Sequence, residues 1–86
     1  MARVLLMQRS IIPHHERRKY LERLLGKKAH YEGASCRFWV FEEADLPGAF
    51  LEFMEGPDAR TLATAHDSSP ERLIDAQRMY REVELV

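Results

Sequence analysis

The spacing of apolar residues changes along the first third of the chain from the pattern of a strand to that of a helix. Arg3–Ile12 is an apolar stretch that stops at a proline, which predicts a strand. From His14 the apolar residues recur every three or four positions, which predicts an amphipathic helix with Lys27 on its charged side. Gly26, followed by two lysines, predicts the end of this helix, and His30–Gly33 has the composition of a loop.

The middle of the chain has the pattern of a β-hairpin. Ser35–Glu43 and Ala49–Glu55 are apolar runs rich in aromatic residues, and the five residues between them include Pro and Gly. With the turn centred on residues 45 and 46, one face carries the pairs Arg37–Met54, Trp39–Glu52 and Phe41–Phe50, and the other carries Phe38–Phe53 and Val40–Leu51. The second face has no charged residue, so we expect it to pack against the helices.

The last third of the chain predicts helical segments followed by a short strand. A helix begins at Pro57 or Asp58 and places Ala59, Leu62, Ala63 and His66 on one face. The sequence Ser-Pro-Glu at 69–71 combines a capping hydroxyl with a first-turn proline and carboxylate, and predicts the start of another helix. In residues 82–85 Glu alternates with Val and Leu, which predicts a charged edge strand.

These elements have the order β-α-β-β-α-(α)-β, and residues 1–86 form one predicted α+β domain. The order is that of the ferredoxin-like split βαβ fold, a four-stranded antiparallel sheet with helices on one face. The predicted register leaves Trp39, Phe41, Phe50 and Met54 on the other face. Three large aromatic side chains amount to about 450–750 Å² of surface, which equals or exceeds the largest apolar patch that a monomer usually exposes. We therefore expect a second, identical chain to cover this face.

Composition and charge exclude several classes of protein. The chain has 45% hydrophobic and 31% charged residues, which is ordinary for a globular domain. Cys36 is the single cysteine, which excludes an internal disulfide and suits a reducing, cytoplasmic compartment. No apolar run near the N-terminus is long enough for a signal peptide or a membrane span. The net charge of −1 conceals a charge of +6 in residues 1–37 and −7 in residues 38–86, which favours self-association over binding to nucleic acid.

The chain resembles the antibiotic-biosynthesis-monooxygenase-like branch of the dimeric α/β-barrel superfamily in three features. These are the order of elements, the apolar hairpin, and the segment Phe53–His66, in which a strand leads into a helix that ends in a histidine. The resemblance implies a homodimeric barrel and cofactor-independent oxygenation of an aromatic or polyketide-like molecule. Many members have a tryptophan where this chain has Glu55-Gly56, and haem-degrading members have a first-strand asparagine that is absent here. Because the fold also serves non-catalytic proteins, a dimeric small-ligand-binding or assembly protein is the alternative.

The candidate site lies on the inner sheet face of this predicted barrel. Its candidate ligand-binding residues are Arg37, Trp39, Phe41, Phe50 and Met54. Glu52 on the same face is a candidate general base whose pKa desolvation would raise; the alternative is an ion pair with Arg37 or Arg9. His66 is a candidate proton shuttle at the cavity edge, or else a hydrogen-bonded histidine that closes the core.

Other chemistries have weaker patterns. The four histidines and Cys36 lack the paired short spacing of zinc motifs, so we predict no metal site. No phosphate loop, nucleophile triad or dinucleotide fingerprint is present, so we predict no cofactor. Residues 49–53 resemble half of the third-strand signature of RNA-recognition motifs, but residues 46–48 lack its basic and aromatic positions. We therefore expect no nucleic-acid partner.

Overall fold

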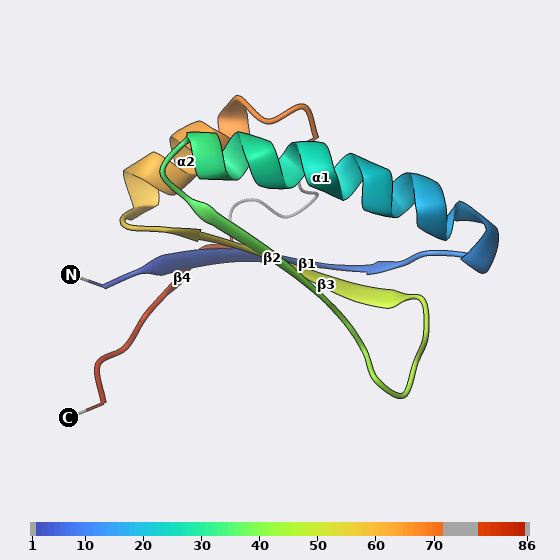
Figure 1. Cartoon of the computed structure of the whole chain (residues 1–86). Coiled ribbons are helices and arrows are strands. Elements are labelled where there is room, and N and C mark those ends of the chain that lie inside the picture. Colours follow the sequence, from blue (N-terminus) through green and yellow to red (C-terminus); the bar gives the residue numbers. More distant parts are fainter. Residues whose placement is uncertain (1, 72–77, 86) are drawn as a thin grey trace.

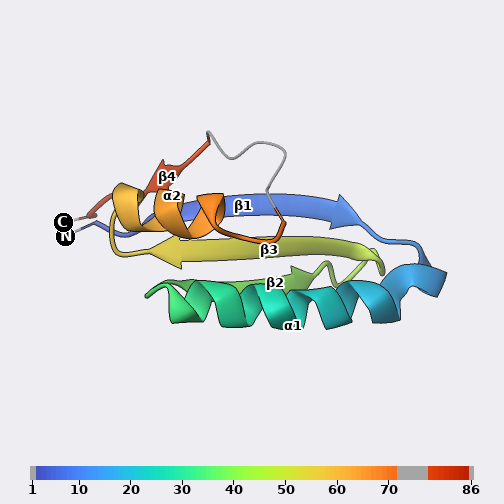
Figure 2. The same cartoon turned by 90° about the horizontal axis from the view of Figure 1, so that it is seen from above.

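The computed structural model describes residues 2–71 and 78–85. Within these residues, two α-helices lie on one side of a four-stranded antiparallel sheet (Figure 1). The strands are β1 (Val4–Ile11), β2 (Arg37–Glu42), β3 (Ala49–Gly56) and β4 (Tyr80–Arg81), in the spatial order β2-β3-β1-β4. A short 3₁₀ helix, η1 (His14–Glu16), leads into α1 (Arg17–Gly33), and α2 (Ala59–Asp67) follows β3. Seen from above, α1 runs along β2, and α2 crosses one end of β3 and β1 (Figure 2).

This arrangement confirms the predicted α+β class with a four-stranded antiparallel sheet, and it is compatible with a ferredoxin-like fold. The predicted strand at residues 82–85 is wrong, because the strand that pairs with β1 lies earlier, at Tyr80–Arg81. The helix predicted after Ser69 falls largely on residues 72–77, outside the described residues.

The predicted end of the first helix at Gly26 is wrong, as is the loop at His30–Gly33, because α1 continues to Gly33. A glycine inside a helix costs about 1 kcal/mol relative to alanine. That cost is outweighed because the next turns of α1 bring Lys27 and Tyr31 into the core. The helix ends where the Ala34 N–H donates back to the Tyr31 carbonyl and Ser35 adopts a positive φ of 63°.

The predicted hairpin register is wrong by one residue. The observed pairs are Arg37–Glu55, Trp39–Phe53 and Phe41–Leu51 on one face, and Phe38–Met54, Val40–Glu52 and Glu42–Phe50 on the other. The connection is fixed by Gly48, which has a φ of +96° and whose carbonyl accepts a hydrogen bond from the Ile12 N–H at 2.8 Å. The β2 side chains keep their predicted faces, but all β3 side chains exchange theirs.

The core lies between the sheet and the helices. Its largest buried apolar members are Leu6, Tyr20, Leu24, Tyr31, Phe38, Phe50, Met54 and Leu62. Full burial of each aliphatic side chain contributes about 1.5–3 kcal/mol. Gly56 lets α2 approach β3, because a Cβ atom there would lie 2.8 Å from the Cβ of Leu62. The Asp58 carboxylate caps α2 by accepting a hydrogen bond from the Thr61 N–H at 2.7 Å.

The side of the sheet away from the helices, which we call the open face, lies between two projections. One is the β2–β3 connection at residues 43–48, and the other is the C-terminal segment, residues 82–85 (Figure 1). The Cα radius of gyration is 13.4 Å, compared with about 12 Å for a compact domain of this length. The molecule therefore has the shape of an arch over its open face.

Candidate binding site on the open sheet face

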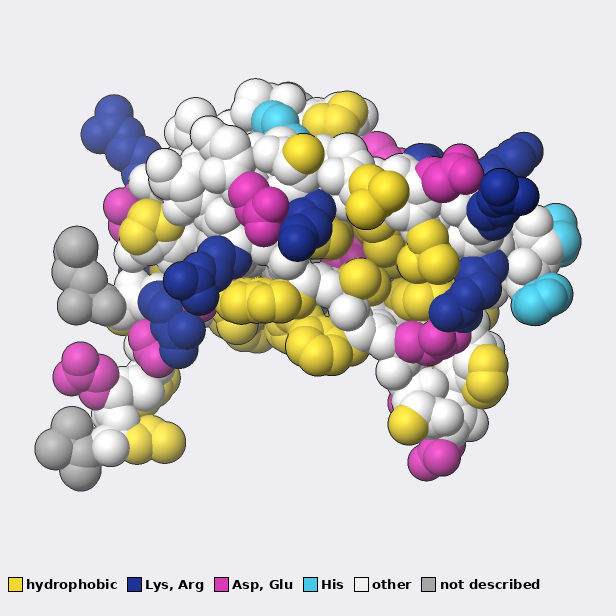
Figure 3. Space-filling view, in the orientation of Figure 1, with side chains coloured by type: hydrophobic (Ala, Val, Ile, Leu, Met, Phe, Trp, Pro, Cys, Tyr) yellow, Lys and Arg dark blue, Asp and Glu magenta, His cyan; other side chains and the backbone are white. Residues whose placement is uncertain are grey.

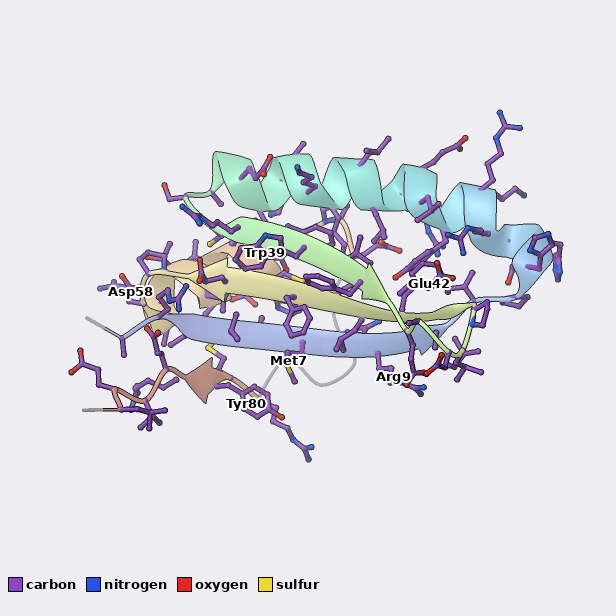
Figure 4. All side chains as sticks on the ribbon, turned by 60° about the horizontal axis from the view of Figure 1, so that its bottom comes forward. Met7, Arg9, Trp39, Glu42, Asp58 and Tyr80 are labelled. Carbon is purple, nitrogen blue, oxygen red and sulfur yellow. The ribbon has the colours of Figure 1, made fainter. Side chains whose placement is uncertain are left out.

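The open face is apolar across all four strands. The observed registers place on it the apolar residues Leu5, Met7, Ile11, Trp39, Phe41, Ala49, Leu51, Phe53 and Tyr80, together with the charged residues Arg9, Arg37 and Glu55. Figure 4 turns this face forward and shows Trp39, Met7 and Tyr80 distributed over β2, β1 and β4. The space-filling view shows apolar side chains gathered under the arch (Figure 3). Ile11 and Phe41 are the most exposed of the apolar residues, at 61% and 58%.

A groove of about 450 Å³ lies on the open face at the end where the two chain termini leave the sheet. Its apolar lining consists of Leu5, Trp39, Phe41, Phe53 and Tyr80. The rings of Phe41 and Phe53 meet edge to face with their centroids 5.6 Å apart. This geometry is one that aromatic rings prefer, so the floor of the groove is an ordered aromatic surface.

Charged side chains line the other side of the groove. The Arg3 guanidinium bridges two carboxylates, with Nη1 2.8 Å from Glu55 Oε1 and Nη2 2.8 Å from Glu82 Oε2. The hydrogen bond from Arg3 lowers the pKa of the Glu82 carboxyl. The Glu82 N–H also donates to the Arg3 carbonyl at 2.8 Å, so Arg3 holds the start of the C-terminal segment against β1.

Glu52 does not lie on the open face, and the predicted position is corrected by the observed register. Its side chain is 2% exposed and lies under α1, where Oε1 accepts from Lys27 Nζ at 2.7 Å and Oε2 accepts from the Tyr20 hydroxyl at 2.8 Å. Burial is the main cause that raises the pKa of Tyr20, and the hydrogen bond from its hydroxyl to Glu52 raises that pKa further. The carboxylate forms an ion pair, but with Lys27 and not with the predicted Arg37 or Arg9.

The structure divides the predicted site into separate groups. Arg37, Trp39 and Phe41 lie on the open face as predicted, whereas Phe50, Glu52 and Met54 lie in the core on the helix side. His66 is buried in the last turn of α2, on the helix side as well, with Nδ1 3.7 Å from Asp67 Oδ1. The two predicted catalytic side chains are therefore not gathered around the open-face groove.

The groove residues that sequence reasoning missed are Arg3, Leu5, Phe53, Glu55, Tyr80, Arg81 and Glu82. Leu5 carries a usable signal, because it belongs to the alternate positions of β1 that face one side. Lys27 was also missed, although positions 20, 24, 27 and 31 recur at helical spacing and share the buried face of α1.

No family model, curated protein or solved structure matches the chain. Any conclusion about function therefore rests on the residues of the chain itself. Among the described residues, no three His, Cys, Asp or Glu side chains are grouped so that they could hold a metal ion. Within that same part of the chain, neither helix has the length and apolar character needed to cross a membrane.

Proposed function

We propose that the protein is a homodimer whose two open faces pack together, as in a dimeric α/β barrel, and enclose the groove as a binding site for a small apolar or aromatic molecule. The observation that carries this proposal is the apolar surface of the open face, which extends over all four strands and is interrupted by Arg9, between Met7 and Ile11. Its five most exposed members are Met7, Ile11, Trp39, Phe41 and Tyr80, which are 37–61% exposed. At about 200 Å² for each large side chain, they present about 500 Å², in the upper range for monomers.

A second copy fits this face better than a charged partner does. Of the charged groups on this face, Arg9 pairs with Glu43 at 3.2 Å and Arg3 pairs with Glu55, whereas Arg37 makes no ion pair among the described residues. The surface therefore presents apolar contact area without strong net charge, and such a surface is complementary to itself about a two-fold axis. The two projections of the arch would then flank the second copy.

The groove supports the choice of ligand class. Its volume of about 450 Å³ lies within the range of about 300–1,000 Å³ for small-molecule sites. Its aromatic floor suits a flat ring, which can stack or pack edge to face on Trp39, Phe41 and Phe53. The carboxylates that line it, Glu55 and Glu82, are both paired with Arg3. We therefore propose binding, and cofactor-independent oxygenation stays a prediction from the family resemblance.

Sedimentation equilibrium tests the dimer. We expect a species of twice 10.1 kDa at micromolar concentration. Phe41→Ser removes an exposed apolar side chain from each of the two open faces, and it should raise the dissociation constant at least about 100-fold at ~25 cal/mol per Å². The control is Lys19→Ser, an exposed position on α1 across the sheet, which should leave the constant unchanged. A chain that stays monomeric at 100 µM would overturn the proposed dimer.

Fluorescence tests the ligand site. Trp39 is the single tryptophan and lines the groove, so its emission reports occupancy directly. Titration with 8-anilinonaphthalene sulfonate should quench Trp39 saturably, and Phe53→Ala should weaken this binding. Quenching that never saturates, or that is the same in Phe53→Ala, would count against a binding site in the groove.

A further inference from the structure

Arg37 is an arginine of the open face whose charge has no counter-charge in contact with it. Arg9, on the same face, pairs with Glu43 at 3.2 Å. Arg3, beside the face, pairs with Glu55 at 2.8 Å. Arg37 is exposed at the start of β2 and makes no ion pair within the part of the chain that the structure describes. Because a guanidinium is always charged and has five N–H donors, Arg37 can bind an anion from solution.

The sheet register places Arg37 beside the groove of the open face. One row across the four strands consists of Tyr80, Leu5, Glu55 and Arg37, and the first three of these line the groove. Trp39, which also lines the groove, follows Arg37 by two positions and lies on the same face (Figure 4). Two residues of a strand span about 6.7 Å. A polar group attached to a ring on Trp39 therefore lies within reach of the Arg37 guanidinium.

A smaller hollow joins Arg37 to the groove. It has a volume of about 320 Å³, and its lining residues are Arg3, Ser35, Arg37, Glu55, Gly56 and Pro57. Arg3 and Glu55 line the groove as well, so the hollow and the groove share a wall. The groove has an aromatic floor, whereas the hollow is lined mainly by polar and charged residues. One small molecule could therefore place a ring in the groove and a polar group in the hollow.

The charges around the groove and the hollow favour an anion as that polar group. Three arginines and two glutamates line them, which gives a local net charge of +1. Both glutamates are bound by Arg3, at 2.8 Å each, so Glu55 is engaged although it lies opposite Arg37. The third arginine, Arg81, lies opposite Val4, which is buried on the helix side. Arg37 is therefore the arginine that a ligand of the open face meets without a bound carboxylate.

Enclosure of the groove strengthens the case for an anion. A second copy packed on the open face would remove water from Arg37. Withdrawing a guanidinium from water is unfavourable unless an anion pairs with it and accepts its hydrogen bonds. A carboxylate does this well, because its two oxygens accept two parallel hydrogen bonds from the planar guanidinium. A single free guanidinium beside Glu55 also suits a monoanion better than a doubly charged phosphate.

We infer that the molecule bound in the groove is an aromatic carboxylate, with its ring on Trp39 and Phe53 and its carboxylate paired with the Arg37 guanidinium in the adjoining hollow. This inference rests on the proposed binding of an aromatic molecule. It adds the chemical group that accompanies the ring, and it assigns a specificity-determining role to Arg37.

Isothermal titration calorimetry with 2-naphthoate and 2-naphthamide tests the inference. The two probes share the same rings and nearly the same shape, and at neutral pH they differ in charge. The dissociation constant of naphthoate should be at least about tenfold below that of naphthamide. Arg37→Gln should weaken naphthoate alone and bring the ratio of the two constants close to one. Phe53→Ala should weaken both probes to a similar extent, because it changes the floor beneath the ring.

The control is Arg9→Gln, which removes a guanidinium from the same face outside the groove and should leave the ratio unchanged. Equal affinities for the two probes in the parent chain would overturn the inference and leave the aromatic site. A preference for naphthoate that persists in Arg37→Gln, or that is lost to the same extent in Arg9→Gln, would also overturn it. If neither probe binds the parent chain, the inference and the proposed ligand site both fail.

Discussion

The Glu52→Gln substitution removes the negative charge that faces the Lys27 ammonium at 2.7 Å while it keeps the size of the side chain. Both residues are almost fully buried, at 2% and 4% exposure. The variant therefore leaves an ammonium in the core without a counter-charge. Breaking a buried pair from one side in this way costs about 3–5 kcal/mol. A domain of 86 residues has about 4–13 kcal/mol of unfolding free energy, so we expect the variant to lose a large share of it.

A second variant distinguishes the loss of the pair from a general loss of packing. Replacing both partners, with Lys27→Met and Glu52→Leu, removes the two charges together and keeps apolar volume in the core. Replacing a buried ion pair by apolar residues is often neutral, or it stabilises the protein by about 1–4 kcal/mol. The same change leaves the Tyr20 hydroxyl without its acceptor, which costs about 1–3 kcal/mol and offsets that gain. We therefore expect the double variant to lie within about 2 kcal/mol of the parent chain.

Urea unfolding followed by far-ultraviolet circular dichroism measures these differences. All variants should be compared at one total protein concentration, because dissociation of a dimer would be linked to unfolding. The reasoning would be refuted if Glu52→Gln unfolded within about 1 kcal/mol of the parent chain, well below the cost expected for a broken buried pair. It would also be refuted if the double variant were as unstable as the single one.

Three further predictions concern the ends of the elements. Hydrogen bonds from Arg17 and from the Gly48 N–H lower the pKa of Glu42 from 4.5 to about 2. These bonds therefore stabilise the folded state fully above about pH 4.5, and that stabilisation is lost as the pH falls toward 2. Glu42→Gln should reduce the fall in the urea midpoint between pH 4.5 and pH 2. Gly48→Ala should destabilise by about 1–3 kcal/mol, because φ is +96° and the new Cβ would lie 2.9 Å from the Ile12 carbonyl oxygen; an unchanged midpoint in urea would contradict this. Asp58→Ala should cost about 1 kcal/mol by uncapping α2, and Asp58→Asn should retain most of that stability in thermal unfolding.

The fold class could be predicted because it depends on local patterns. The strand-to-helix change after Pro13 and the short hairpin connection determine the order of the elements, and few antiparallel sheets fit that order. The hairpin register could not be predicted in the same way. Phe50, Leu51, Phe53 and Met54 are apolar on both sides of β3, so alternation does not identify the buried side.

The candidate site was partly misplaced for the same reason. Glu52 is the one charged residue in the middle of β3, and we used it to mark the side away from the core. Its partner, Lys27, precedes it by 25 residues and follows a glycine that resembles a helix end. A buried ion pair between distant segments leaves no local pattern, since each charge taken alone indicates exposure. The open-face positions of Trp39 and Phe41 did not depend on this choice and were predicted correctly.

The Lys27–Glu52 pair also has a consequence for how the hairpin folds. A hairpin shifted by one residue would bury about as much apolar surface, because β3 is apolar on both sides. That shifted hairpin would carry Glu52 to the open face and leave Lys27 under the sheet without a counter-charge. The two pairings thus become unequal when α1 docks, and the helix selects between hairpins that the strands alone leave nearly equal in energy.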